Sequence, residues 1–222
     1  TAAFVGPSNE QVDCECADGT PVIREVMGPG GPAYLPNSGG IVTITSVGIV
    51  EVLNPGYPGE FDPPLMDQTI PRDYGFGATE GTVTIGNYTV PSLAVSWSNA
   101  SIELDFIALP AGLSTGQLMV TNAAGVQTKI GVTLVVGSEI AAPLTVAADG
   151  TGDTTTIQAA VDAASDGQLI LVKPGIYHEN VVVYKKVRIQ GAGAGSTIID
   201  AIHFPGTALI AQRAKVVELL DA

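Results

Sequence analysis

The sequence has few charged residues, few aromatic residues and no long apolar run. Charged residues account for 14% of its 222 residues and aromatic residues for 5%. No apolar run reaches the roughly 18 residues that a transmembrane helix needs. No charged segment followed by an apolar stretch marks a signal peptide, and Thr1-Ala2-Ala3 suits a mature N-terminus from which one was removed. A hydrophobic fraction of 45% excludes a disordered chain.

Basic residues are also scarce. Asp and Glu outnumber Lys and Arg by 22 to 9, which gives a formal net charge of −13. Nucleic acids and anionic membranes repel such a chain, so neither is an expected partner. Solubility explains most of this acidity. Ca²⁺ is the one ion that these residues could favour, because Glu60, Asp62, Asp67 and Asp73 share a Pro- and Gly-rich segment and carboxylates are ligands for Ca²⁺. Their spacing matches no EF-hand loop, so the sequence predicts no metal site and no cofactor.

Only two cysteines are present, Cys14 and Cys16, and both lie in the segment 1–39. Repeated Gly-Pro pairs in this segment break helices and strands, so we expect an irregular N-terminal extension. A disulfide between residues so close together is strained. Three states therefore stay open, namely a disulfide to another chain or to a missing part of the protein, free thiols, and a mutual disulfide. Metal binding is disfavoured because the segment adds only carboxylates.

The central region, 40–138, shows the alternation of half-buried strands. Gly and Pro are frequent (27 and 15 residues) and separate short runs rich in Val, Thr and Ile. About seven short strands over roughly 100 residues indicate an immunoglobulin-like β-sandwich. The predicted strands are 41–45, 47–52, 81–85, 94–97, 101–106, 117–121 and 131–136.

Turn and aromatic residues in this region carry a more specific resemblance. Gly75-Phe76-Gly77-Ala78-Thr79 precedes a Val-Thr strand, Trp97-Ser98 follows, and then come Thr115-Gly116 and Asn122-Ala123-Ala124-Gly125. In this order the motifs resemble an IPT/TIG domain, which has an immunoglobulin-like fold. We expect Trp97 to fill the core between the sheets, and Gly116 and Gly125 to permit tight turns.

The pattern changes after a short linker at 141–143. A helix is predicted over 157–164, with Thr155 or Thr156 as its N-cap and with Ile157 and Val161 on its apolar face. Short apolar strands separated by bends follow. They indicate the capped start of a right-handed parallel β-helix over 143–207, in which the helix covers the open end. The predicted strands are 169–172, 181–183, 187–191 and 197–200.

Three short motifs in this segment resemble the start of pectin methylesterases and other pectate-lyase-like proteins. They are Thr156-Ile157-Gln158-Ala159-Ala160, Val172-Lys173-Pro174-Gly175-Ile176-Tyr177 and Glu179-Asn180-Val181. The resemblance implies a β-helix fold. In that family the catalytic carboxylates and arginine project from later rungs, to which no residue of 144–200 corresponds. We therefore expect no catalytic residue in this chain.

The remaining candidate residues receive structural interpretations. Asp149 and Asp153 lie at the entry to the cap, before the helix, where Asp-Gly turns have a structural role. His178 and His203 are expected as exposed turn residues, because no nucleophile or metal-ligand motif accompanies them. The segment 208–222 is predicted as an amphipathic helix with Leu209, Val216, Leu219 and Leu220 on one face.

These observations predict an all-β protein with short helices only at the cap and the C-terminus. Our functional hypothesis is a non-catalytic structural or interaction module of a secreted or cell-surface protein, such as a surface layer, sheath or filament. Its partner would be another polypeptide that continues the β-helix, from the same cleaved precursor or from a neighbouring subunit of an oligomer. The alternative is a carbohydrate-binding or polysaccharide-processing protein, with glycans as ligands, whose active rungs lie outside this chain. Scarce aromatic residues favour the first hypothesis.

Overall fold

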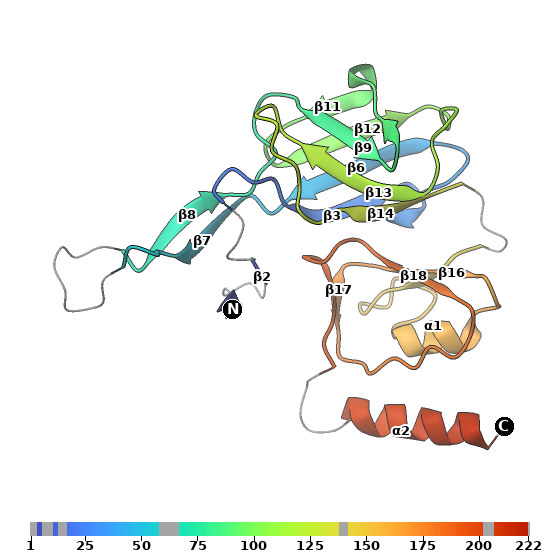
Figure 1. The fold of residues 1–222 in the computed structure, drawn as a ribbon. Helices are drawn as coiled ribbons and strands as arrows, with labels where there is room; N and C mark the ends of the chain where they lie inside the picture. The colour runs from blue at the N-terminus through green and yellow to red at the C-terminus, as the bar shows by residue number, and fades with distance from the viewer. Residues whose placement is uncertain are drawn as a thin grey trace.

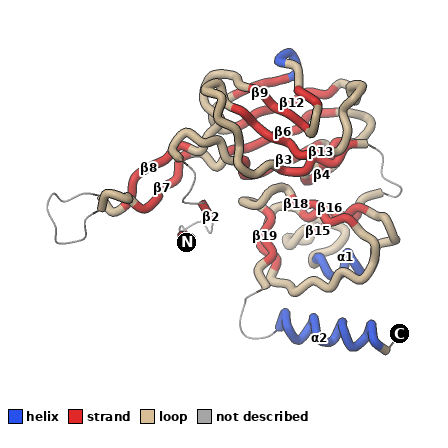
Figure 2. Tube along the Cα trace, viewed as in Figure 1, coloured by secondary structure: helices blue, strands red, loops and turns tan. Residues whose placement is uncertain are grey.

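The computed structural model describes residues 4–5, 11–12, 17–57, 67–137, 142–201 and 207–221. Strands dominate this part of the chain and helices are few (Figure 2). The all-β class is therefore confirmed. No helix among the described residues is long and apolar enough to cross a membrane.

Two five-stranded sheets form the upper body in Figure 1. The order in one sheet is β10 (Tyr88–Thr89), β9 (Thr82–Ile85), β13 (Gly116–Thr121), β14 (Val132–Val136) and β5 (Tyr34–Leu35). The order in the other is β11 (Val95–Trp97), β12 (Ser101–Phe106), β6 (Gly40–Ser46), β3 (Ile23–Gly28) and β4 (Gly31–Pro32). A short 3₁₀ helix, Ser92–Ala94, precedes β11.

Apolar side chains from both sheets meet in one core. Leu104 on β12 and Leu134 on β14 are fully buried in the same cluster as Phe76. Burial alternates residue by residue along β12, because successive side chains of a strand point to opposite faces. The apolar face of each sheet is thus removed from water by the other sheet.

The structure differs from the expected N-terminal extension in residues 17–39. Strand β3 pairs with β6 inside the second sheet, and Ile23 and Val26 are buried in the core. The register shifts between Ile23 and Glu25, as at a β-bulge. This shift places two core residues three positions apart, so the period-2 pattern that predicts a strand is broken. The short strands β1 (Phe4–Val5) and β2 (Gln11–Val12) pair with each other.

Of the three sandwich residues with a predicted structural role, Gly125 has the expected conformation, whereas Trp97 and Gly116 differ from the prediction. Trp97 is only partly buried and lies at the edge of the core, where its indole N–H donates to the Gly77 carbonyl at 2.9 Å. Its ring packs edge-on against Phe76, with centroids 6.2 Å apart. Gly125 has a φ of 80° in a turn, as expected. Gly116 lies within β13 instead, where a Cβ would be 2.8 Å from the Gly86 nitrogen.

A two-stranded hairpin projects from one end of the sandwich (Figure 1). It consists of β7 (Ile49–Leu53) and β8 (Thr69–Asp73), which pair antiparallel and join no other strand of the described residues. Strand β8 contains Pro71 and lies in the segment for which no strand was predicted.

The lower body in Figure 1 is a coil of parallel strands closed by a helix. Its sheets are β15 (Leu144–Val146), β16 (Leu169–Val172) and β18 (Arg188–Gly191), and β17 (Gly175–Tyr177) with β19 (Thr197–Ile199). All pairs are parallel, so the chain passes from one sheet to the other and returns one turn later. Helix α1 (Ile157–Ala163) buries Ile157 and Val161, as predicted, against this coil.

The two bodies are in contact through a small apolar cluster. Leu169 and Leu171 on the outer face of β16 pack with Tyr34 of β5 and Val135 of β14. The Val26 N–H of β3 also donates to the Ala192 carbonyl at 2.7 Å. The sandwich therefore covers one lateral face of the parallel coil.

Candidate functional site

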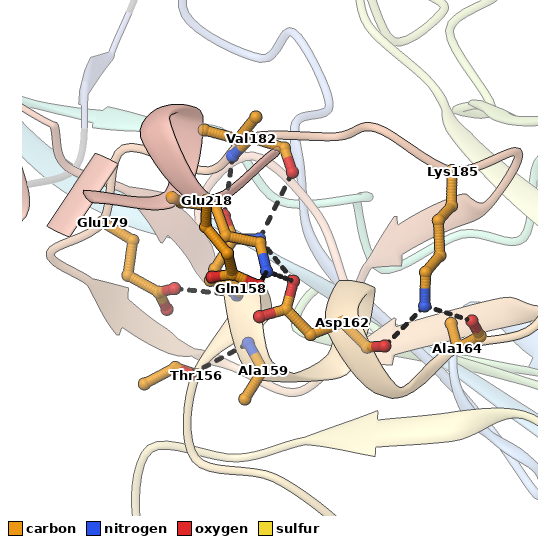
Figure 3. Close-up of polar contacts among 10 residues, drawn as sticks. Thr156, Gln158, Ala159, Asp162, Ala164, Glu179, Val182, Lys185 and Glu218 are labelled. Carbon is orange, nitrogen blue, oxygen red and sulfur yellow. Dashed lines mark hydrogen bonds and ion pairs between the residues drawn. The ribbon is translucent and has the colours of Figure 1, made fainter. Parts of the chain in front are cut away.

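The cap of the parallel coil contains a network of polar contacts around helix α1 (Figure 3). Thr156 caps α1, because its hydroxyl oxygen accepts from the Ala159 N–H at 3.2 Å. Glu179 contributes both carboxylate oxygens, which accept from the N–H groups of Ile157 at 2.8 Å and Gln158 at 2.9 Å. Three of the backbone donors that a helix leaves unpaired at its start are thus bonded.

Gln158 ties the helix to the segment that follows β17. Its Oε1 accepts from the Val182 N–H at 2.7 Å and its Nε2 donates to the Val182 carbonyl at 3.3 Å. Nε2 also donates to Asp162 at 3.0 Å. The predicted strand at 181–183 is therefore wrong: Val182 gives its backbone groups to a glutamine side chain instead of a neighbouring strand.

A second group of contacts surrounds the C-terminal end of α1. Lys185 donates through Nζ to the backbone carbonyls of Asp162 and Ala164, which a helix leaves free at its end (Figure 3). The same Nζ lies 5.5 Å from the centre of the Tyr184 ring. A cation at this end of a helix also interacts favourably with the negative end of the helix dipole.

Helix α2 (Thr207–Leu220) contacts the cap through a buried lysine. Lys215 Nζ lies 3.1 Å from Asp162 Oδ1, 3.0 Å from Glu218 Oε1 and 5.0 Å from the centre of the Tyr184 ring. The hydrogen bond to Glu218 raises the pKa of Lys215, with Asp162 adding to the effect. Burial opposes the ionisation of Asp162, but hydrogen bonds from Gln158 and Lys215 hold its pKa below the ordinary value.

The predicted apolar stripe of this tail helix lies mostly on its exposed side. Leu209, Val216 and Leu220 are exposed, while the polar Lys215 is buried. The amphipathic pattern therefore predicts the helix correctly but not the face that contacts the cap. Lys215 can be buried on that face because it has two carboxylate partners, whereas a lysine without such partners would be costly to bury.

Asp149 and Asp153 shape the turn that leads to α1. Asp149 Oδ1 accepts from the Thr151 hydroxyl at 2.7 Å and from its N–H at 3.0 Å. Asp153 Oδ2 accepts from the Thr145 N–H at 2.8 Å and from its hydroxyl at 2.7 Å. These bonds lower the pKa of each carboxyl group. The geometry agrees with the structural role expected for both residues.

The remaining candidate residues are dispersed. His178 is exposed in a turn, and its Nδ1 lies 3.3 Å from Asp200 Oδ2. Asp67 lies two residues before β8 and Asp73 is the last residue of that strand, which alone spans about 13 Å at the rise of an extended strand, so they do not share one ion. Within the described ranges no three His, Cys, Asp or Glu residues are grouped for a metal. The expected roles of Cys14, Cys16, Glu60, Asp62 and His203 fall on residues outside the described part of the chain.

The chemical effect of the cap is to close the coil with hydrogen bonds between distant segments. The roles of Glu179 and Gln158 were not predicted, because their partners are 21 to 24 residues away in the sequence. The one signal was their occurrence in two of the three quoted motifs, Thr156-Ile157-Gln158-Ala159-Ala160 and Glu179-Asn180-Val181.

The capped coil coincides with a family match. Residues 143–212 match part of the pectinesterase family. Pectinesterase 2 of Arabidopsis thaliana is 48% identical over 73 residues, which cover 30% of this chain and 12% of that protein. Pectinesterase 3 of Solanum lycopersicum is 45% identical over 89 residues, 34% of this chain and 16% of that protein. The chain thus spans less than a fifth of the length of these curated relatives.

A third relative covers less of the chain and is similarly close in sequence. The probable pectinesterase/pectinesterase inhibitor 17 of Arabidopsis thaliana is 49% identical over 57 residues, 24% of this chain and 11% of that protein. These matches contradict two expectations, that the protein is not an enzyme and that it is a structural module of a surface layer, sheath or filament. They favour the alternative of a polysaccharide-processing protein.

Proposed function

We propose that the protein is a pectin-processing enzyme that hydrolyses the methyl esters of pectin. In this reaction water adds to the ester carbonyl carbon and the bond between that carbon and the methoxy oxygen breaks. One proton of the water passes to the methoxy oxygen to give methanol, and the other is released to solvent as the galacturonate carboxylate forms. The pectinesterase match carries the proposal, because it coincides with the cap in which Gln158 and Glu179 make their bonds. In this proposal the chain supplies the closed end of the catalytic β-helix.

The parallel strands support the finer description of this region as the start of a right-handed β-helix. Ile170 of β16 pairs with Ile189 of β18, and Ile176 of β17 pairs with Ile198 of β19. Successive turns are thus stacked in register, as in a solenoid. For the sandwich we propose an immunoglobulin-like domain of the IPT/TIG type, supported by its two packed sheets, in which all pairs except β14 with β5 are antiparallel, and by the ordered motifs around Trp97.

The charge of the chain favours an esterified substrate. Segment 1–142 holds 14 of the 22 acidic residues and only three of the nine basic ones, while 143–222 holds eight and six. Methyl-esterified galacturonan is uncharged, whereas the de-esterified polymer is a polyanion that an acidic sandwich repels. The acidic sandwich therefore does not repel esterified regions of the polymer, but it disfavours rebinding of the de-esterified product.

We also propose that further parallel strands continue the coil, from the same precursor or from a neighbouring polypeptide. Strands β18 and β19 are the last of their sheets in the described structure, and Ile189 and Ile199 are exposed on them. An exposed strand edge with apolar side chains is a template for another strand. Because pectin is a wall polysaccharide, we place the protein outside the cell, secreted or at the cell surface.

The test is methanol release from highly methyl-esterified pectin by the natural full-length protein. Light scattering on the same sample is expected to give a mass above the 22.6 kDa of this chain. Fully de-esterified pectin serves as the substrate control and should yield no methanol. If charge selects the substrate, free polygalacturonate should inhibit methanol release only weakly at low salt and more strongly when added salt screens its repulsion by the acidic sandwich. A folded full-length protein that releases no methanol would contradict the proposal.

A further inference from the structure

The projecting hairpin has two edges, and its hydrogen-bond register defines which backbone groups face outward. Asn54 N–H donates to the Gln68 carbonyl, and Tyr74 N–H donates to the Gly48 carbonyl. The hydrogen-bonded pairs of an antiparallel ladder alternate with pairs that are not bonded. The backbone groups of Ile49, Glu51 and Leu53 on β7 therefore point away from β8, as do those of their counterparts on β8.

The outer edge of β8 is closed by two features of the chain. Pro71 lies opposite Glu51 and has no N–H to offer to a further strand. The next outward residue, Asp73, is already bonded, because its N–H donates to Asp18 Oδ1 at 2.8 Å and its carbonyl accepts from Gly19 at 2.9 Å. Proline and a covering loop are the means by which proteins prevent pairing at an edge.

The outer edge of β7 carries neither feature. No strand of the described ranges pairs with it, and its outward residues 49, 51 and 53 all have an N–H group. The side chains of Ile49 and Leu53 are 68% and 48% exposed, with the exposed Glu51 between them. The hairpin is thus protected on one edge only, and a two-stranded ribbon is marginally stable in water without a third strand.

We propose that the outer edge of β7 is a docking site for an extended strand of another protein. The occupant presents apolar side chains toward Ile49 and Leu53 and a basic side chain toward Glu51, because directly opposed residues of paired strands contact one another. A second copy of this chain fits poorly. Symmetric antiparallel pairing centred on Glu51 would oppose two glutamates, and both chains carry a formal charge of −13.

The experiment uses the full chain and the synthetic peptide TTVTKTVTT, with TTVTETVTT as the matched acidic control. Binding is measured by fluorescence anisotropy of labelled peptide, and its position by amide hydrogen exchange. We expect the basic peptide to bind two- to fivefold more tightly than the acidic one and to slow exchange at Ile49, Glu51 and Leu53. Exchange in strands β3 and β12 should not change.

Two variants of one position separate the backbone from the charge. Glu51→Pro removes an outward N–H together with the carboxylate and should weaken binding of both peptides at least tenfold, so its comparison with Glu51→Gln isolates the contribution of the N–H. Glu51→Gln keeps the N–H and should bring the two peptides to equal affinity. Trp97 fluorescence melting of both variants should match the parent, which shows that the sandwich is intact.

Several outcomes would overturn the proposal. Equal binding by Glu51→Pro, or no slowing of exchange at β7 with millimolar peptide, would show that the edge does not dock strands. Protection at Arg188–Gly191 instead would assign the peptide to the open end of the coil. If, without peptide, protection of the β7 amides from exchange increases with the concentration of this chain, the occupant of the edge is a second copy.

Discussion

The sandwich and the capped coil are stabilised in different ways, although they share one chain and a common interface. The sandwich encloses a large apolar core to which both sheets contribute, and its alternating strands are paired mainly by backbone bonds. The coil has a smaller core, in which eight of the described residues are buried around α1. Its closure depends on side chains such as Glu179 and Gln158, which bond to the backbone of distant segments.

The comparison predicts that the sandwich is sensitive to lost volume and the cap to lost hydrogen bonds. Apolar burial is distributed over many residues, so its pattern is visible along each strand. Bonds to charged side chains are few and individually stronger. The most costly substitutions in the sandwich should therefore be those that remove apolar volume, and the most costly ones in the cap those that remove a hydrogen-bonding side chain.

The largest effect is expected in the sandwich core. Leu104→Ala should lower the free energy of unfolding by about 3–5 kcal/mol, because it removes a fully buried side chain and leaves a cavity. The control is the same substitution at the fully exposed Leu93, with an expected change within about 0.5 kcal/mol. Urea unfolding followed by fluorescence of Trp97, the one tryptophan of the chain, measures both. Similar values for the two variants would show that the core is not cooperative.

A smaller effect is expected at the cap. Glu179→Ala should cost about 2–4 kcal/mol of local stability, because it leaves the N–H groups of Ile157 and Gln158 without their charged acceptor. Amide exchange of these two groups should accelerate, while the Trp97 unfolding curve shifts little. Exposed Glu80→Ala is the matched control and should change neither measurement. A parallel loss of sandwich stability would show that the two bodies unfold as one unit.

These effects also explain how much of the fold the sequence predicts. Strands β6, β9, β11, β12, β13 and β14, each with a period-2 pattern, coincide with predicted segments to within one or two residues. Strand β3 was missed because a bulge breaks its alternation. Trp97 was placed too deep, since its indole N–H needs an acceptor and finds one at the rim, while Phe76 fills the interior.

The cap is predictable only where its signals are local. Thr156 precedes the apolar positions of α1 and bonds to a group three residues away, so it can be recognised as an N-cap. Glu179 has no such local signal, because its partners lie 21 and 22 residues earlier in the chain. Lys215 has the same difficulty, since its burial depends on Asp162 in another helix.

The smallest predicted effect distinguishes charge from hydrogen bonding in the turn before the cap. Bonds from the Thr145 N–H and hydroxyl lower the folded-state pKa of Asp153. The ionised carboxylate therefore stabilises the fold above the unfolded pKa of about 4, and this contribution disappears as the pH falls through the lower folded pKa. Asp153→Asn keeps an acceptor oxygen but removes the charge.

This substitution should cost less than about 1 kcal/mol at pH 7, because the group is exposed and screened by water. The difference in melting temperature from the parent should shrink as the pH falls from 5 through the lowered folded pKa of Asp153, because the parent carboxylate is then protonated. Thr145→Val is the companion variant, since it removes the hydroxyl bond and leaves the N–H bond. In its presence the Asp153→Asn change should be smaller still at pH 7. A melting difference that stays constant while the pH falls through the folded pKa of Asp153 would show that its charge adds nothing to stability. The turn would then depend on packing, like the sandwich, and not on charged hydrogen bonds, like the rest of the cap.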